Sequence, residues 1–295
     1  MFARVLFGAV FSVLVVVSSL AHAIIIHDAA KDDPVWGQEH IDVAKKYDCV
    51  VAVFGRNQQG WGLIGTGTVI SPYDVLFARH CAFSNDGSPF LEYRINTGTH
   101  LIEDRWARYE TFKMHEMPGY TGVGSPDMAI LTFDQVIRDV TPATLYRGND
   151  LDLIGSVVDM IGFGYLGYPS VGPVTLDGAK RGCQNIIEQL GYPPSGYGTH
   201  QLITYFHPPG HPNYQHLGGG GLNFDSGGGW FVNGQLVAVA DWTAAYAGYN
   251  DPTGATSVSQ HIGWIDSIIV PEPGTLIMFG TGVVFVLFFL RRKRR

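Results

Sequence analysis

The chain has 295 residues, of which 46% are apolar and 15% charged, so it has ample material for a packed core and is not intrinsically disordered. Its formal charge is −7, but six of the 19 basic residues lie at the two ends, and the body between them has 13 basic against 25 acidic residues. A body near −12 is a poor match for a polyanion, which argues against nucleic-acid binding.

Residues 1–23 have the pattern of a secretory signal peptide. Arg4 precedes an apolar run from Val5 to Leu20, and Ala21-His22-Ala23 fits the rule of small residues around a cleavage site. We therefore expect signal peptidase to produce a mature chain that begins at Ile24; an uncleaved membrane anchor is the alternative. In an oxidising compartment, three cysteines form at most one internal disulfide and leave one thiol over, and Cys49–Cys81 is the preferred pair over those with Cys183 because both flank strands in the first half.

Between the two ends, short β-rich runs alternate with clusters of Gly, Pro, Asn and Asp, and segments with a helical period are few. This pattern predicts an all-β sandwich or barrel. The segment Pro142 to Asp152 is turn-like and is predicted to connect two halves, and a short helix is expected from His261 to Val270, where isoleucines form one stripe. The predicted strands are 49–54, 67–70, 75–78, 128–133, 157–162, 202–206 and 230–240.

Three residues at the ends of predicted strands or in turns could carry chemistry. His80 ends the run Val75-Leu76-Phe77-Ala78-Arg79-His80-Cys81, Asp127 precedes the apolar strand Met128-Ala129-Ile130-Leu131, and Ser226 lies in Asp225-Ser226-Gly227-Gly228-Gly229. Each alone is more often structural. Together they supply a nucleophile, a base that titrates near neutrality, and a carboxylate that orients the base.

These three segments resemble the histidine, aspartate and serine motifs of trypsin-like serine proteases. The gaps of 47 and 99 residues between His80, Asp127 and Ser226 are similar to the gaps of about 45 and 93 in the chymotrypsin triad. The resemblance spans residues 24–269 and implies two antiparallel six-stranded β-barrels, at about 45–145 and about 153–260, followed by a short helix. It also implies peptide-bond hydrolysis through an acyl-enzyme on Ser226, with no cofactor.

The oxyanion hole is where the sequence departs from this family. The backbone amides of Phe224 and Ser226 would form it, but the family usually has glycine at the position of Phe224. A Cβ restricts the dihedral angles that aim this amide, and loss of one such donor typically costs about 2.7–4 kcal/mol of transition-state stabilisation. Phe224 therefore favours a weak or inactive enzyme. It also breaks the Gly-x-Ser-x-Gly motif of α/β-hydrolases.

The resemblance further implies a substrate pocket. Asp241-Trp242 resembles the segment that pairs with substrate backbone, and Gly220 stands where proteases that cut after Lys or Arg carry an acid. We therefore expect the pocket to accept a small apolar side chain. The pocket residues that the resemblance assigns are Gly220, Asp241, Trp242, Thr243 and Gly254.

An activation pair is also implied. In this family a new N-terminal amine can pair with the acid before the serine, and here signal-peptide removal would let Ile24 pair with Asp225. A loose N-terminal arm is the alternative.

Three histidines, His207, His211 and His216, crowd a proline-rich segment. Neutral imidazoles bind zinc, but the prolines prevent the helix that would place histidines on one face, and no carboxylate or cysteine motif accompanies them. A surface loop near the active cleft is the preferred interpretation, and we expect no metal site.

Residues 270–295 contain three elements in order. Val270-Pro271-Glu272-Pro273-Gly274 precedes an apolar stretch from Thr275 to Leu290, and five basic residues end the chain. The stretch is short for a bilayer, which normally takes about 20 residues, and the basic end would stay cytoplasmic by the positive-inside rule. The segment resembles the PEP-CTERM sorting signal of Gram-negative bacteria, which implies recognition by an exosortase and an inner-membrane anchor until the tail is processed.

The sequence thus predicts a signal peptide (1–23), a trypsin-like domain (24–269) and a sorting segment (270–295). The first hypothesis for its function is a serine endopeptidase that acts on protein or peptide substrates in the cell envelope or outside the cell. The second is a binding or surface-scaffold protein that keeps the protease fold without turnover, as Phe224 suggests. The third is a structural surface protein in which the triad match is accidental.

Overall fold

The computed structural model describes residues 24–84, 87–103, 106–109, 112–122, 125–192, 197–221, 223–244 and 247–269. The predicted signal peptide and the apolar helix predicted in the sorting segment lie outside these residues. Within the part of the chain that is described, no helix is both long and apolar enough to cross a membrane.

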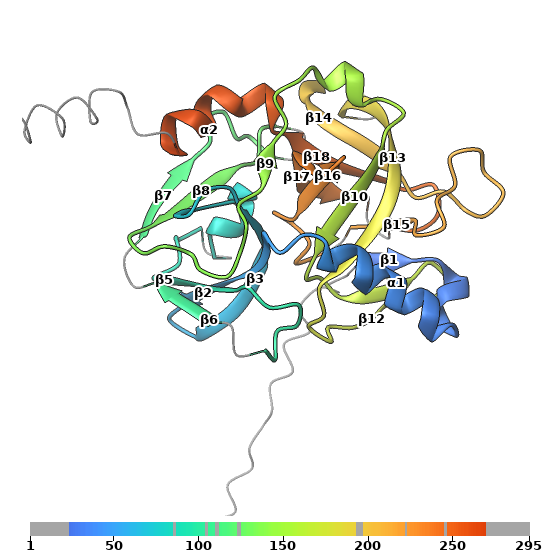
Figure 1. Ribbon diagram of the computed structural model, residues 1–295, viewed down its shortest axis with the longest axis horizontal. Coiled ribbons are helices and arrows are strands. Elements are labelled where there is room, and N and C mark those ends of the chain that lie inside the picture. Colours follow the sequence, from blue (N-terminus) through green and yellow to red (C-terminus); the bar gives the residue numbers. More distant parts are fainter. Residues whose placement is uncertain are drawn as a thin grey trace, which may run out of the picture.

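The first β unit is an antiparallel sheet of seven strands in the order β6-β5-β2-β3-β4-β8-β7 (Figure 1). No pairing joins the edge strands β6 and β7 among the described residues, so this unit is a half-barrel. Its core is built from buried apolar side chains such as Val51, Leu76 and Ile130. The strands are β2 (Val50–Asn57), β3 (Gly60–Val69), β4 (Asp74–Phe77), β5 (Glu92–Asn96), β6 (Trp106–Tyr109), β7 (Phe112–Glu116) and β8 (Ala129–Phe133).

The second β unit is a closed barrel of six antiparallel strands in the order β16-β10-β13-β14-β18-β17, with β17 pairing back onto β16. A short strand, β9 (Thr144–Leu145), adds to β17 in parallel. Val158, Cys183 and Trp230 are fully or almost fully buried in its core. The barrel strands are β10 (Val157–Gly162), β13 (Arg181–Tyr192), β14 (Tyr197–Tyr205), β16 (Gly229–Val232), β17 (Gln235–Thr243) and β18 (Pro252–Ser257).

A third, four-stranded sheet incorporates the predicted mature N-terminus. Its order is β12-β11-β1-β15, so β1 lies between two strands of the second half of the chain. Helix α1 follows; Asp33 caps it by accepting hydrogen bonds from the amides of Val35 and Trp36. The elements are β1 (Ile24–Ile26), α1 (Pro34–Lys45), β11 (Leu166–Tyr168), β12 (Gly172–Thr175), β15 (Gly219–Gly220) and four 3-10 turns: η1 (Asp28–Lys31), η2 (Arg79–Ala82), η3 (Asp150–Leu153) and η4 (Ser259–His261).

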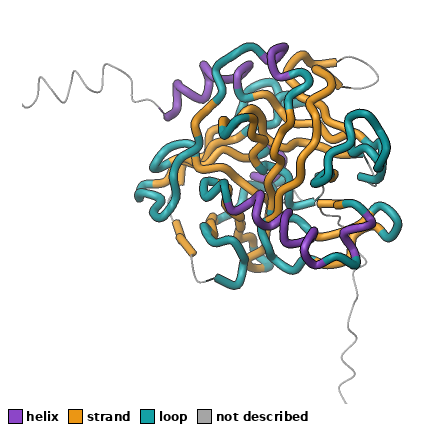
Figure 2. The backbone as a smooth tube through the Cα atoms, turned by 45° about the vertical axis from the view of Figure 1, so that its right-hand side comes forward, coloured by secondary structure: helices purple, strands orange, loops and turns teal. Residues whose placement is uncertain are grey.

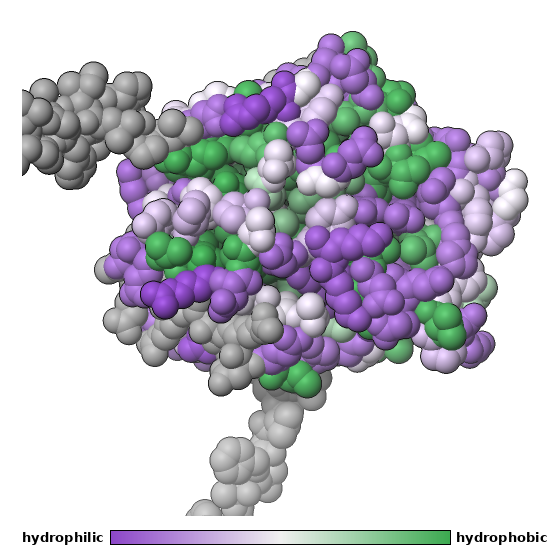
Figure 3. Space-filling model, in the orientation of Figure 1, coloured by the Kyte–Doolittle hydropathy of each residue, from purple (hydrophilic) through white to green (hydrophobic). Residues whose placement is uncertain are grey.

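The predicted all-β architecture with a short C-terminal helix is confirmed, because two β units are followed by α2 (Ile262–Ile269). The second unit has the six strands predicted for each barrel, and the first is a half-barrel with seven. Helix α1 and the third sheet were not predicted. Helices lie at the periphery of the strands (Figure 2), and apolar residues form separate patches between polar ones on the face shown in Figure 3.

The predicted Cys49–Cys81 disulfide is wrong, since all three cysteines are free and buried. The carbonyl of Cys49 accepts a hydrogen bond from Val69 at one end of β3, whereas Cys81 lies beside Gly65. Four residues of a strand span about 13 Å, and a disulfide needs Cα atoms less than about 7 Å apart. Cys49 and Cys81 therefore lie too far apart along the sheet to be joined.

The central strand β1 suggests a stability test. Ile25 is fully buried and packs with Phe206 and Ala247. We expect Ile25→Ala to lower the free energy of unfolding by about 2–5 kcal/mol, through lost burial and the cavity left behind. Ile102→Ala is the matched control, because Ile102 is 85% exposed. Equal urea midpoints for the two variants would contradict a structural role for β1.

Candidate active site

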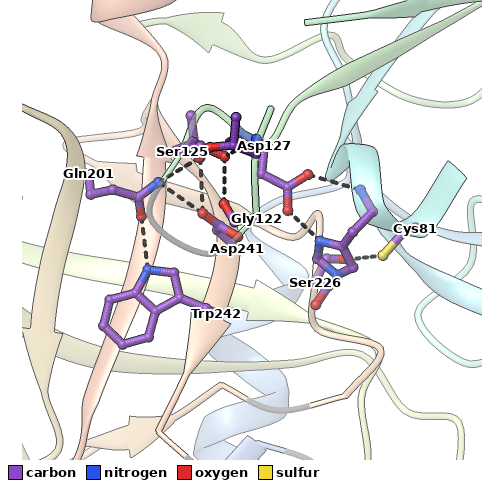
Figure 4. Close-up of polar contacts among 11 residues, drawn as sticks. Cys81, Gly122, Ser125, Asp127, Gln201, Ser226, Asp241 and Trp242 are labelled. Carbon is purple, nitrogen blue, oxygen red and sulfur yellow. Dashed lines mark hydrogen bonds and ion pairs between the residues drawn. The ribbon is translucent and has the colours of Figure 1, made fainter. Parts of the chain in front are cut away.

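His80 and Asp127 are brought together by the pairing of β4 with β8. Phe77 lies opposite Ala129 in this pair, so η2, which follows β4, meets the segment that precedes β8. The backbone amide of His80 donates to Asp127 Oδ1 at 2.9 Å, and His80 Nδ1 hydrogen-bonds Asp127 Oδ2. Asp127 is only 1% exposed. The buried carboxylate of Asp127, labelled in Figure 4, thus holds His80 through one contact to the backbone and one to a ring nitrogen.

The pKa values of this pair shift in opposite directions. Burial disfavours the imidazolium of His80, but Cys81 and Asp127 favour it more strongly, so the pKa of His80 is raised. Burial likewise disfavours the Asp127 carboxylate, but hydrogen bonds from His80 and Asp241 lower its pKa. The pair is therefore suited to take up a proton on His80 while Asp127 stays ionised.

Ser226 lies in the turn between β15 and β16, which is held against the first β unit. Its carbonyl accepts a hydrogen bond from the amide of Thr66 at 2.9 Å. Gly227 adopts φ +86°, and a Cβ there would lie 2.1 Å from the carbonyl oxygen of Thr66. Only glycine, which has no Cβ, lets the turn come this close to Thr66, and this explains why a glycine follows Ser226.

Ser226 and His80 both line two cavities. One, of about 610 Å³, extends along the first β unit over Trp61, Leu63 and Phe90. The other, of about 240 Å³, extends along the second unit over Trp242. No hydrogen bond joins Ser226 Oγ to His80 among the described residues, a contact that commonly forms or tightens only when substrate binds. The three predicted triad residues thus meet at one solvent-accessible site.

Phe224 adopts the left-handed backbone conformation, with φ +71°. Its carbonyl accepts a hydrogen bond from Thr66 Oγ1 at 2.6 Å, and its ring stacks on Tyr165. The amides of Phe224 and Ser226 donate to no other described residue, and both residues line the larger cavity. Phe224 therefore adopts a backbone conformation that is strained for a residue with a Cβ.

Comparison with solved structures agrees with this geometry. The chain is similar to neuropsin, a serine protease expressed in the limbic system of mouse brain, with a TM-score of 0.58 and 16% identity; the match covers 76% of this chain and 95% of neuropsin. The fold is that of a trypsin-like serine protease. A model of the PEP-CTERM protein-sorting motif matches residues 270–295, and no curated protein matches the chain. The motif indicates export and sorting to the cell envelope, and it implies processing by an exosortase.

The predicted pocket residues lie at or next to the smaller cavity. Asp241, Trp242 and Thr243 line the smaller cavity, whereas Gly220 and Gly254 are not among its lining residues. Gly220 pairs with Ile25, and a Cβ at Gly254 would lie 2.2 Å from the ring of Trp242. These two glycines allow close packing, and their chain neighbours Gly221 and Thr253 line the cavity, so a pocket role for Gly220 and Gly254 stays a prediction.

The predicted activation pair lies close to the third sheet. Asp225 is buried and accepts a hydrogen bond from the amide of Gly164 at 2.8 Å. Ile24 pairs with Leu166, two residues further along the chain. Pairing of a free Ile24 amine with Asp225 stays a prediction.

The three clustered histidines do not converge on one site. His207 bonds Glu188 and stacks on His211, whereas His216 bonds Glu39 at 2.9 Å. Among the described residues, ligand atoms of the right kinds converge at His80, Asp127 and Asp241, within 4.8 Å of one another. His80 and Asp127 already hydrogen-bond each other, and Asp241 accepts a hydrogen bond from Gln201.

Asp241 has a second role that the sequence did not reveal. Its buried carboxyl accepts a hydrogen bond from Gln201 Nε2 at 2.9 Å, and a carboxylate oxygen of Asp241 lies within 4.8 Å of one of Asp127. Burial, and then the charge of Asp127, raise the pKa of Asp241 well above its usual value. Gln201 and Thr256, which complete this network, carry no motif that could have identified them.

Proposed function

We propose that this protein is an exported serine endopeptidase that uses Ser226, His80 and Asp127. The observation that carries the proposal is the His80–Asp127 pair at a cavity that Ser226 also lines. A buried, hydrogen-bonded acid behind an accessible histidine, next to a serine on a glycine-rich turn, suits acyl transfer.

In the proposed mechanism, Ser226 Oγ attacks the carbonyl carbon of the scissile peptide bond while His80 Nε2 takes its proton. Asp127 holds the Nδ1 proton and stabilises the imidazolium. The amides of Phe224 and Ser226 donate to the oxyanion. His80 then protonates the leaving amine, and water, deprotonated by the same ring, attacks the ester on Ser226 and releases the acid.

The two cavities support cleavage within a chain and suggest a preference. Because they extend from Ser226 over both β units, a polypeptide can continue on each side of the scissile bond. The smaller cavity is narrowed by Thr243 and Thr253, whose hydroxyls lie 3.3 Å apart. We propose a small apolar side chain there.

We further propose that signal peptidase releases the chain at Ile24 and that residues 275–290 anchor it in the inner membrane until an exosortase processes the tail. The second candidate function, a protease-fold binding protein without turnover, rests on Phe224, whose strained backbone must aim an oxyanion donor.

A fluorophosphonate probe tests the proposed activity. We expect covalent labelling of the wild type on the peptide that contains Ser226, and none of Ser226→Ala, since only an activated serine reacts. Ser267→Ala is the matched control, because Ser267 lies exposed in α2. Folded wild-type protein that stays unlabelled would favour the binding protein.

A further inference from the structure

The inference concerns Asp241, which lies behind the acid of the proposed triad. Figure 4 shows Asp241 and Gln201 on the far side of Asp127 from Ser226. Asp241 belongs to β17, at a register shift between Ala240 and Trp242 where β17 pairs with β18. Such irregularities commonly redirect a side chain, and Asp241 is 7% exposed.

The network around Asp241 fixes the role of each of its oxygens. The indole of Trp242 donates to Gln201 Oε1 at 3.1 Å, which turns the amide nitrogen of Gln201 towards Asp241. Asp241 Oδ2 accepts from that nitrogen at 2.9 Å and from Thr256 Oγ1 at 3.4 Å. Since Oδ2 serves as an acceptor, Oδ1 is left to carry a proton and to donate.

Two adjacent buried carboxyls do not both ionise near neutral pH unless cations compensate them. The titratable groups that face this pair are His80, Arg79 and Tyr120. Arg79 already pairs with Glu116 at 2.8 Å and lies over the ring of Tyr120. Gln201 on β14 and Thr256 on β18 are neutral. The two hydrogen bonds from His80 stabilise one carboxylate, and the other carboxyl keeps its proton.

That proton belongs on Asp241. Asp127 receives two hydrogen bonds from His80, through its amide and its ring, and both favour the ionised form of Asp127. Asp241 has no contact with a cation among its described hydrogen bonds.

We propose that Asp241 is a positioning residue: its protonated carboxyl donates a hydrogen bond to Asp127 and thereby holds Asp127 against His80. The kinetic consequences rest on the proposed protease function, whereas the protonation state does not. Loss of the proton from Asp241 at alkaline pH removes this donor. Without that donor, Asp127 is held less firmly against His80, and the rate is expected to fall.

Two substitutions of Asp241 distinguish the effect of the hydrogen bond that it donates from the effect of its packing. Asparagine keeps the shape of aspartic acid and donates to Asp127 at every pH, whereas alanine cannot donate. We expect kcat/KM of Asp241→Ala to be about 10- to 100-fold below that of Asp241→Asn, as is typical for a lost hydrogen bond to a charged group. We also expect the alkaline fall of the wild-type profile to be absent in Asp241→Asn. Equal rates and identical pH profiles for the two variants would overturn the proposal.

A second measurement does not depend on activity. Carboxyl carbons of aspartate can be titrated by NMR in ¹³C-labelled Ser226→Ala protein, with Asp127→Asn and Asp241→Asn identifying the two signals. At pH 7 we expect Asp127 to be ionised and Asp241 to be protonated. An ionised Asp241 at that pH would refute the proposal. Lack of fluorophosphonate labelling with a protonated Asp241 would instead refute the protease function alone.

Discussion

His80→Ala is expected to lower kcat for peptide hydrolysis by about 10⁶-fold, because serine and histidine of such a triad act as one unit. His80 is the only imidazole among the described residues that line the two cavities. The side chain of His80 is 35% exposed, so the loss should come from chemistry and not from unfolding. Activity on a peptide ester and on a protein substrate measures the effect.

The control for this variant is His115→Ala. His115 lies in β7, the edge strand of the same β unit. The substitution therefore removes an imidazole from the same sheet but not from either cavity. We expect wild-type rates for it, with equal thermal midpoints for both variants. Retention of more than about 1% activity in His80→Ala would show that His80 is not the base that activates Ser226.

Phe224→Val is expected to lower kcat/KM about 100-fold or more relative to Phe224→Gly. Both variants lose the ring that stacks on Tyr165. They differ in the backbone, because φ is +71° here and a β-branched residue is strongly disfavoured in that region. Valine should rotate the amide away from the oxyanion, and loss of one such donor typically costs about 10²–10³ in kcat. Steady-state kinetics on one substrate measures the ratio.

The two variants of Phe224 are also expected to differ in stability. A left-handed backbone costs a residue with a Cβ about 1–2 kcal/mol, so Phe224→Gly should unfold at higher urea than Phe224→Val. Equal kinetics together with this stability difference would mean that Phe224 supplies no catalytic donor. Probe labelling of both variants keeps that outcome distinct from a general loss of the site.

The strands were predictable where apolar runs are bounded by turn residues. β10 matches the predicted range 157–162, and the turn at Asn233 and Gly234 has positive φ at both residues, as a two-residue hairpin requires. Helix α1 was missed because its apolar face is narrow, with only His40, Val43 and Ala44 buried. Its start, Asp33-Pro34, does carry a capping signal.

The candidate site was predictable only where short motifs carry it. His80, Asp127 and Ser226 each stand next to a recognisable strand or glycine turn, so local sequence was sufficient to single them out. Gln201 and Thr256 have no such context, and their contacts with Asp241 depend on strands β14, β17 and β18 lying side by side. The assignment of Gly220 and Gly254 to the substrate pocket stays a prediction, because a residue without a side chain acts there only through the space that it leaves to its neighbours.

By itself, the sequence determined the β-rich architecture, the three-residue catalytic hypothesis and the sorting tail, because all three depend on patterns within a few neighbouring residues. Tertiary structure alone decided that the cysteines stay apart, that β1 enters a sheet made by later strands, and that Asp241 faces Asp127. The physical reason is that strand pairing and burial join residues more than a hundred positions apart. The charge state of a carboxyl follows from those neighbours.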